Sequence, residues 1–238
     1  MGNAFSEPPP NLEELPVMTI QGERCHIAEK ISHGDYDATL LAWIPEKGYY
    51  VVKKIDKDIF EDPSDSLCIF KKYATKANLH DYLKKEGPMK EDSAKETFRE
   101  IVRGLQYIHS KGISHGNLKP QNILYSSTLV FLSKAVIDDY GIAEFVKEDL
   151  FPRSPFCAPE VYAVQPYNRF KADVYSLGIL LKEMVTGYKS ATVSLDCKNL
   201  IDNLTNRNPN SRPSLVAVLN DRWFNNTAKV YSMFYRDD

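Results

Sequence analysis

The sequence predicts an α+β protein of two lobes, with strands in the first third of the chain and helices in the remainder. Short β-type runs extend from Arg24 to Ile55 and are broken by Gly34 and by residues 45–48. After Gly87 the spacing of apolar residues changes to that of a helix. This order favours a small antiparallel sheet lobe and a larger helical lobe, with a ligand-binding cleft between them.

Composition sets the expected boundaries of these lobes. Residues 1–20 are expected to form a disordered tail, because the chain opens with polar residues and four prolines. The sheet lobe is expected over residues 21–74, in which Tyr49–Ile55 and Ser66–Tyr73 are predicted strands. The helical lobe is expected over residues 75–226, and a C-terminal extension over residues 227–238.

The helical lobe is predicted to be built around one apolar helix. Asp173–Thr186 is apolar on most sides and is closed by Gly187, which is typical of a helix at the centre of a domain. Shorter helices are predicted over Ser194–Leu204 and Pro213–Leu219. Another helix is predicted to end at Lys111–Gly112, from the helical spacing of Ala94, Phe98, Ile101, Val102, Leu105 and Ile108.

Composition also argues against several classes of function. The formal net charge of −2 gives no reason to expect nucleic-acid binding. The cysteines form no Cys-x-x-Cys pair, which argues against a zinc site and a disulfide framework. No apolar run approaches the roughly 18 residues of a membrane span, and no signal peptide opens the chain. We therefore expect a cytoplasmic protein.

Five features in a fixed order resemble the protein kinase family. Residues 115–124 read HGNLKPQNIL, like the catalytic loop, and residues 139–141 read Asp-Tyr-Gly where the family has Asp-Phe-Gly. Residues 158–160 read Ala-Pro-Glu, like the end of the activation segment. Asp173 and Arg212 match two further positions. The resemblance covers residues 21–224 and implies a protein-kinase-like two-lobed fold.

The resemblance also implies which residues bind ATP and its metal ion. Asn122 and Asp139 match the family's ligands for Mg²⁺ or Mn²⁺. Lys53 matches the strand lysine that binds phosphates, and Lys119 matches the lysine of the catalytic loop that contacts phosphate. Residues 32–37 match a degenerate glycine-rich loop. Most of these assignments have a simpler alternative. Lys53 would be a solvated strand lysine, Asn122 a turn asparagine and Asp139 a loop carboxylate. Residues 32–37 would be a hairpin without a ligand.

The departures from the family concern its chemistry. Asn117 stands where the family has its catalytic aspartate, and an amide cannot accept the proton that a carboxylate would. General-base catalysis is typically worth about 10²–10⁴ in rate. Gly116 replaces the arginine that anchors a phosphorylated activation loop. Asp35 and Asp37 lie where phosphates approach and would repel them. If Asn117 still orients a hydroxyl, a slow enzyme is the alternative.

The spacing leaves no room for the family's regulatory helix, which carries the glutamate partner of the strand lysine. Only residues 56–65 precede the next strand, and this stretch is acidic and contains a proline. We therefore predict that Tyr50–Ile55 pairs directly with Leu67–Lys72 as its antiparallel neighbour. The alternative is that Glu61 or Asp62 substitutes for the missing glutamate.

Residues with scaffold roles in the family are retained. Glu160 and Arg212 match a pair that forms a buried ion pair, and Asp173 matches the residue that supports the catalytic loop. The segment between Gly187 and Leu195 is too short to contain the helix that the family usually has between these two positions. The sequence therefore keeps the scaffold better than the chemistry.

The amino terminus fits the pattern for myristoylation of Gly2, because residues 1–6 read Met-Gly-Asn-Ala-Phe-Ser. One acyl chain gives only marginal membrane binding, and acidic residues precede the first basic residue, Arg24. We expect weak, reversible, peripheral association with membranes.

Together, these observations predict a pseudokinase that acts on a protein partner as a nucleotide-binding scaffold or allosteric regulator. The first alternative is a weakly active Ser/Thr protein kinase that transfers phosphate from ATP to protein. The second alternative is an interaction module with a kinase fold and no nucleotide.

Overall fold

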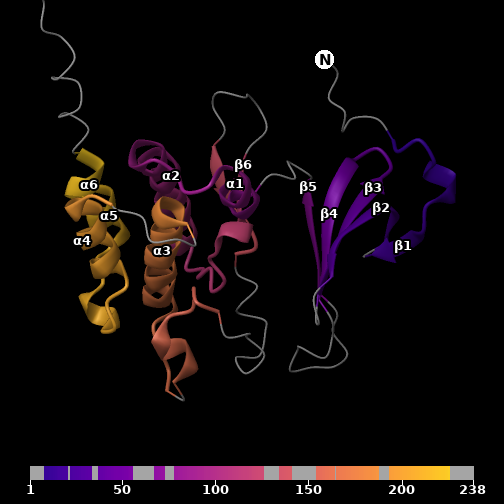
Figure 1. Cartoon of the computed structure of the whole chain (residues 1–238). Helices are drawn as coiled ribbons and strands as arrows, with labels where there is room; N and C mark the ends of the chain where they lie inside the picture. The colour runs from indigo at the N-terminus through magenta and orange to yellow at the C-terminus, as the bar shows by residue number, and fades with distance from the viewer. Residues whose placement is uncertain are drawn as a thin grey trace, which may run out of the picture. The chain divides into compact units, whose positions relative to one another are not determined.

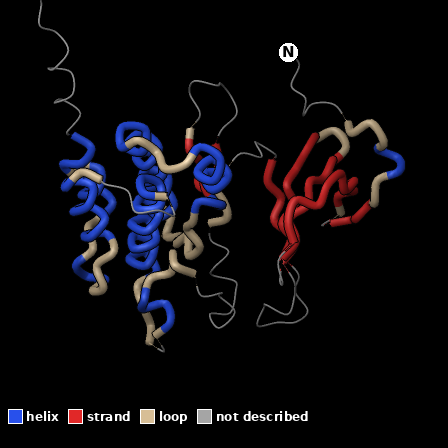
Figure 2. Tube along the Cα trace, viewed as in Figure 1, coloured by secondary structure: helices blue, strands red, loops and turns tan. Residues whose placement is uncertain are grey.

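The computed structural model describes residues 8–20, 22–33, 37–55, 67–72, 78–125, 134–140, 154–163, 165–187 and 193–225. These residues form two compact units, one ending at Lys72 and the other beginning at Asn78. Strands build the first unit, and helices build most of the second (Figures 1 and 2). The expected α+β class, with an antiparallel N-terminal sheet and a helical C-terminal part, is confirmed.

The first unit contains η1 (Leu12–Glu14), β1 (Val17–Ile20), β2 (Glu23–His33), β3 (Asp37–Ile44), β4 (Gly48–Ile55) and β5 (Leu67–Lys72). The strands form one antiparallel sheet in the order β1-β2-β3-β4-β5. A turn separates β3 from β4 at residues 45–47, as predicted, and the predicted break at Gly34 lies outside the described residues. A small core packs on the sheet through Cys25, Leu40, Ala42, Ile44 and Val52.

The expected disordered tail is wrong over its last residues, because Val17–Ile20 forms β1. This strand pairs with β2 from Val17↔His26 to Ile20↔Glu23. The chain before it is also held, since Ile27 N donates to Pro16 O at 2.8 Å. The pairing gives these backbone groups protein partners in place of water. Proline-rich composition hid a short apolar strand, and residues 1–7 lie outside the described residues.

The predicted direct pairing of β4 with β5 is confirmed. The two strands are antiparallel, with a register from Tyr50↔Lys72 to Ile55↔Leu67. In the described sheet, β5 is the last strand, so one of its edges has no neighbouring strand. The connecting residues 56–66, including Glu61 and Asp62, lie outside the described residues.

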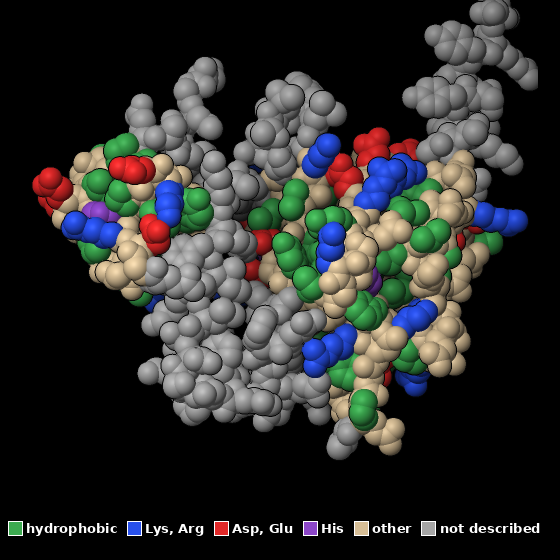
Figure 3. All heavy atoms as spheres, turned by 180° about the vertical axis from the view of Figure 1, so that it is seen from behind, with side chains coloured by type: hydrophobic (Ala, Val, Ile, Leu, Met, Phe, Trp, Pro, Cys, Tyr) green, Lys and Arg blue, Asp and Glu red, His purple; other side chains and the backbone are tan. Residues whose placement is uncertain are grey.

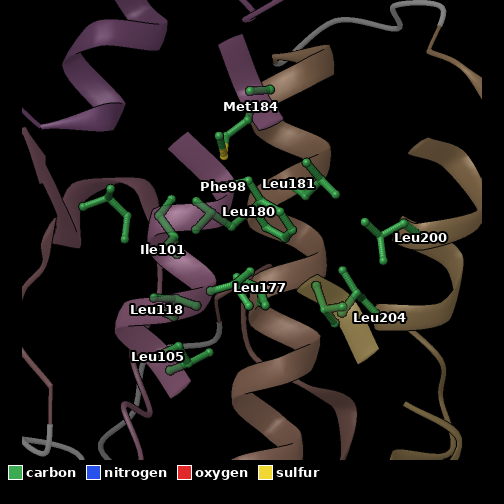
Figure 4. Packing of buried hydrophobic residues seen from close by; sticks show 14 of the residues in the cluster. Phe98, Ile101, Leu105, Leu118, Leu177, Leu180, Leu181, Met184, Leu200 and Leu204 are labelled. Atoms are coloured by element: carbon green, nitrogen blue, oxygen red, sulfur yellow. The ribbon is translucent and has the colours of Figure 1, made fainter. Parts of the chain in front are cut away.

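The second unit contains α1 (Leu79–Glu86), α2 (Glu91–Ser110), η3 (Pro120–Asn122), β6 (Ile123–Tyr125), β7 (Ala135–Ile137), η6 (Pro159–Tyr162), α3 (Arg169–Thr186), α4 (Leu195–Leu204), η7 (Pro209–Ser211), α5 (Leu215–Leu219) and α6 (Arg222–Asn225). Helix α3 lies at its centre, between α2 and α4 (Figure 4). The core between these helices includes Phe98, Ile101, Leu105, Leu118, Leu177, Leu180, Leu181, Met184, Leu200 and Leu204. None of the helices in the described residues is long and apolar enough to cross a membrane.

The predicted helix ends agree with the structure, but three starts differ, and α4 begins at Leu195 because Ser194 is its N-cap. Helix α3 begins at Arg169 rather than Asp173, because the Asn168 side chain caps it by accepting a hydrogen bond from Lys171 N at 3.1 Å. It ends before Gly187, as predicted, and the positive φ of 60° there favours glycine. Helix α5 begins two residues later than expected, after its cap Ser214.

Glu91, at the start of α2, links three helices. Its Oε1 accepts Ser194 N at 2.6 Å, and its Oε2 accepts Ser194 Oγ at 2.7 Å and Trp223 Nε1 at 2.8 Å. Burial raises the pKa of Glu91, but these hydrogen bonds to the charged form outweigh burial and leave the pKa below its usual value. The carboxylate therefore holds the N-cap of α4 and the start of α6 against α2.

Candidate functional site

The loop over residues 115–124 is anchored on Asp173, which lies in α3 and is 1% exposed. Its Oδ2 accepts His115 N at 2.8 Å, and its Oδ1 accepts Gly116 N at 2.8 Å. His109 Nε2 lies 2.8 Å from the same Oδ2. One buried carboxylate therefore fixes the backbone at the start of the loop, which confirms the support expected from Asp173.

Gly116, which stands in place of the family's arginine, has a backbone suited to glycine. Its φ is 74°, in the left-handed region where a side chain costs roughly 1–2 kcal/mol. The same N–H is donated to Asp173. Glycine adopts this backbone conformation without strain, whereas an arginine at this position would be strained.

Asn117 lies on this anchored loop with its backbone held from two sides. Its N–H donates to His115 Nδ1 at 3.3 Å, and its carbonyl accepts Asn122 Nδ2 at 2.7 Å. Burial lowers the pKa of His115, although nearby Asp173 opposes this effect. The ring accepts the Asn117 N–H at Nδ1. No hydrogen bond of the Asn117 side chain occurs within the described residues, and that side chain is half-buried.

The hairpin of β6 and β7 brings the two predicted metal ligands to one end. Asn122 immediately precedes β6 and Asp139 closely follows β7, while the register pairs Ile123 with Ile137. Asp138 N donates to Asn122 O at 2.8 Å, which closes the end of the hairpin. Asp139, with a positive φ of 58°, follows directly. An amide oxygen and a carboxylate at one hairpin end suit a hard divalent cation.

The remaining predicted site residues are divided between the two units. Lys119 is half-buried just before η3, and its carbonyl accepts Asn122 N at 2.9 Å. Lys53 is half-buried in β4 of the first unit, between Thr39 and Ile69 on the neighbouring strands. Residues 34–36 of the predicted glycine-rich loop lie outside the described residues. The structure thus brings Asn117, Lys119, Asn122 and Asp139 together within the second unit.

The predicted ion pair of Glu160 and Arg212 is confirmed. Arg212 Nη1 and Nη2 lie 2.5 and 2.8 Å from the two Glu160 oxygens, with side-chain exposures of 0% and 15%. Arg212 Nε also donates to Asn206 O at 2.8 Å, and Nη1 to Lys171 O at 2.7 Å. Tyr175 covers the guanidinium, 5.0 Å from the ring centre. The guanidinium is therefore buried with nearly all its hydrogen bonds made.

Several contacts were not predicted from sequence. Nothing in the spacing of His109 indicated its contact with Asp173. Lys171 and Asn206 contribute backbone carbonyls, which carry no sequence signal. Glu91 lies in the first turn of α2, and nothing in the sequence indicated its contacts with Ser194 and Trp223.

Comparison with known proteins agrees with this geometry. The model of the protein kinase domain matches residues 49–192, which is more than half of the chain. The chain belongs to the protein kinase family. The matched residues include the anchored loop, the β6–β7 hairpin and the Ala-Pro-Glu segment.

Kinase relatives from two kingdoms resemble the chain. It is 32% identical to the putative sperm motility kinase W of Mus musculus over 90% of this chain and 44% of that protein. It is 29% identical to sperm motility kinase 2B of Mus musculus over 65% of this chain and 36% of that protein. It is 27% identical to CBL-interacting serine/threonine-protein kinase 8 of Arabidopsis thaliana over 66% of this chain and 41% of that protein. The chain spans about two fifths of the length of these curated relatives.

Proposed function

We propose that this member of the protein kinase family is a pseudokinase that acts as a nucleotide-binding scaffold or allosteric regulator. The observation that carries the proposal is Asn117, an amide at the position of the family's catalytic base. The two residues before it are anchored on Asp173 through their backbone N–H groups. The scaffold is therefore retained, while the proton acceptor at its centre is replaced.

Nucleotide binding is proposed because the ends of the β6–β7 hairpin retain Asn122 and Asp139. Their oxygens suit Mg²⁺ or Mn²⁺, which would bridge the phosphates of ATP. The same residues support a second candidate, a weakly active Ser/Thr protein kinase. One relative is named as a serine/threonine-protein kinase, and this name favours that class of activity if any transfer occurs.

ATP is expected to stabilise the chain only together with a divalent cation. Binding to the folded state at 100 times Kd adds about 2.7 kcal/mol, which would raise Tm by roughly 5–10 °C. The measurement is a thermal-shift titration with ATP, with and without Mg²⁺ or Mn²⁺. Asp139→Ala should abolish the shift, because a carboxylate ligand is lost.

A matched control for this titration is Asp92→Ala, which removes an exposed carboxylate from α2. It should leave the ATP-dependent shift unchanged. Equal stabilisation of Asp139→Ala and the wild type would refute the metal-ligand assignment. A chain that ATP never stabilises would be an interaction module without nucleotide.

Phosphate transfer is expected to be at least about 10²-fold slower than in a kinase that has the aspartate, because Asn117 cannot act as a base. Radiolabel transfer from ATP to a generic protein substrate measures this rate. Asn117→Asp alone should not restore a normal rate, since the regulatory helix is missing from the predicted spacing. Robust transfer by the wild type, abolished in Asp139→Ala, would favour the weakly active kinase instead.

Two further expectations stay predictions. Gly2 lies outside the described residues, so its myristoylation and the weak membrane association that would follow are proposals. Intact mass from a eukaryotic host, compared with Gly2→Ala, measures the acyl group directly. A cytoplasmic location and a protein partner are likewise proposed.

A further inference from the structure

A groove of about 800 Å³ runs along α3 and α4 in the second unit, apart from the proposed nucleotide residues. Tyr175, Ile179, Lys182 and Thr186 line it from α3, at the spacing of one helical face. Lys198, Ile201, Asp202 and Thr205 line it from α4 in the same way. The remaining lining residues are Pro159, Val193 and Arg207.

The rim of this groove is basic. Lys182, Lys198 and Arg207 are exposed, and Asp202 is the one acidic residue in the lining. None of the three cations makes an ion pair with another residue, as far as the described chain shows. With three cations and one carboxylate, the rim therefore carries a positive excess, above apolar side chains such as Ile179 and Ile201.

The walls of the groove are held rigidly. A Cβ on Gly178 would lie 2.6 Å from Leu204 Cβ and 2.8 Å from Thr205 Cγ2, so only glycine allows this approach of α3 to α4. At the η6 end, Tyr175 packs on Arg212, which is itself paired with Glu160. A preformed groove loses less conformational entropy when a ligand binds.

We propose that this groove binds an acidic segment of a protein partner that carries apolar anchor residues. Helix α4 is about 15 Å long, which matches roughly four or five residues of extended chain at about 3.3 Å each. Acidic side chains would pair with the three rim cations, and aliphatic or aromatic side chains would cover Ile179 and Ile201. This proposal specifies where the proposed scaffold would bind its partner. It depends on the proposed function only in assuming that a protein partner exists.

The observations favour a peptide over a nucleic acid. Binding to a phosphate backbone requires an extended basic stripe, whereas this rim holds three cations and one carboxylate. On the face in Figure 3, the Lys and Arg side chains of the helical unit form no continuous stripe: one group lies beside Asp and Glu side chains and the others are scattered. The apolar floor also has no counterpart in a backbone of phosphates.

The test is fluorescence anisotropy of the full chain with a labelled peptide composed of Asp, Glu, Leu and Phe. The wild type should bind it, and affinity should fall with rising salt. The double variant Lys182→Glu with Arg207→Glu should weaken binding about tenfold or more. Ile179→Ala should weaken it about fivefold through the lost apolar contact. Lys84→Glu, an exposed charge reversal on α1, is the matched control and should have no effect.

Several outcomes would overturn the proposal. These are no binding by the wild type, equal binding by the groove variants, and equal binding of a peptide with Asn and Gln in place of Asp and Glu. Tighter binding of a labelled single-stranded RNA that the groove variants abolish would assign the groove to nucleic acid. A wild-type dimer that the same variants dissociate, measured by light scattering, would assign it to a second copy. The assay contains no ATP, so its failure is separable from failure of nucleotide binding.

Discussion

Arg212→Ala is expected to lower the free energy of unfolding by about 3–5 kcal/mol, because it leaves the Glu160 carboxylate largely buried without its partner. For a chain of this length, this corresponds to a fall in Tm of about 6–20 °C. The change also removes the donors to Asn206 O and Lys171 O. Urea denaturation gives the free energy from the midpoint and the slope.

Arg222→Ala, an exposed arginine in α6, is the matched control and should change the free energy of unfolding by less than about 0.5 kcal/mol. Glu160→Gln combined with Arg212→Ala measures the coupling of the pair through a double-mutant cycle. A loss below about 1 kcal/mol for Arg212→Ala would mean that the pair does not hold η6 to the segment between η7 and α5.

Asp173→Ala is expected to have the second large effect, because it removes the acceptor of two backbone N–H groups at the start of the loop and the partner of His109 Nε2. Leaving a buried donor unsatisfied costs about 1–3 kcal/mol, and the N–H groups of His115 and Gly116 both lose their partner. The free energy of unfolding, again from urea denaturation, should fall accordingly. Amide exchange at Gly116 should also quicken, since its N–H becomes free.

Asp173→Asn tests the effect of the negative charge, because asparagine has nearly the same shape as aspartate but no charge. The amide keeps one oxygen acceptor but turns an NH₂ group toward the other donors, so its loss of stability should lie between the wild type and Asp173→Ala. Glu96→Ala removes an exposed carboxylate from α2 and should be nearly neutral. Unchanged exchange at Gly116 in Asp173→Ala would contradict the assigned role.

Much of the fold was predictable because each element carries a local signal. The stop signal at Lys111–Gly112 predicted the end of α2, and Gly187 predicted the end of α3, since each signal lies within one turn of the helix end. The pairing of β4 with β5 followed from counting, because residues 56–65 leave room for little else. The strand Val17–Ile20 was missed because its partner β2, and not its own composition, makes it a strand.

The candidate site was predictable only where motifs carry it. Asn117, Asn122 and Asp139 were found from the family pattern, and the structure places them on one loop and one hairpin end. The link from Glu91 to Ser194 and Trp223 was missed, because it joins residues 103 and 132 positions apart. The close approach at Gly178 was missed as well, since only the position of α4 makes a side chain there impossible.

The sheet order β1-β2-β3-β4-β5 has a consequence for how this unit folds. Each strand pairs only with its neighbour in the chain, so the sheet is a meander in which each described pairing closes a short connection. Loop-closure entropy grows with connection length, and folding rates fall as contacts become more distant in sequence. The direct joining of β4 to β5 thus gives this unit a low contact order for a sheet. Its hairpins can form one after another as the chain is synthesised, before α3 has been made.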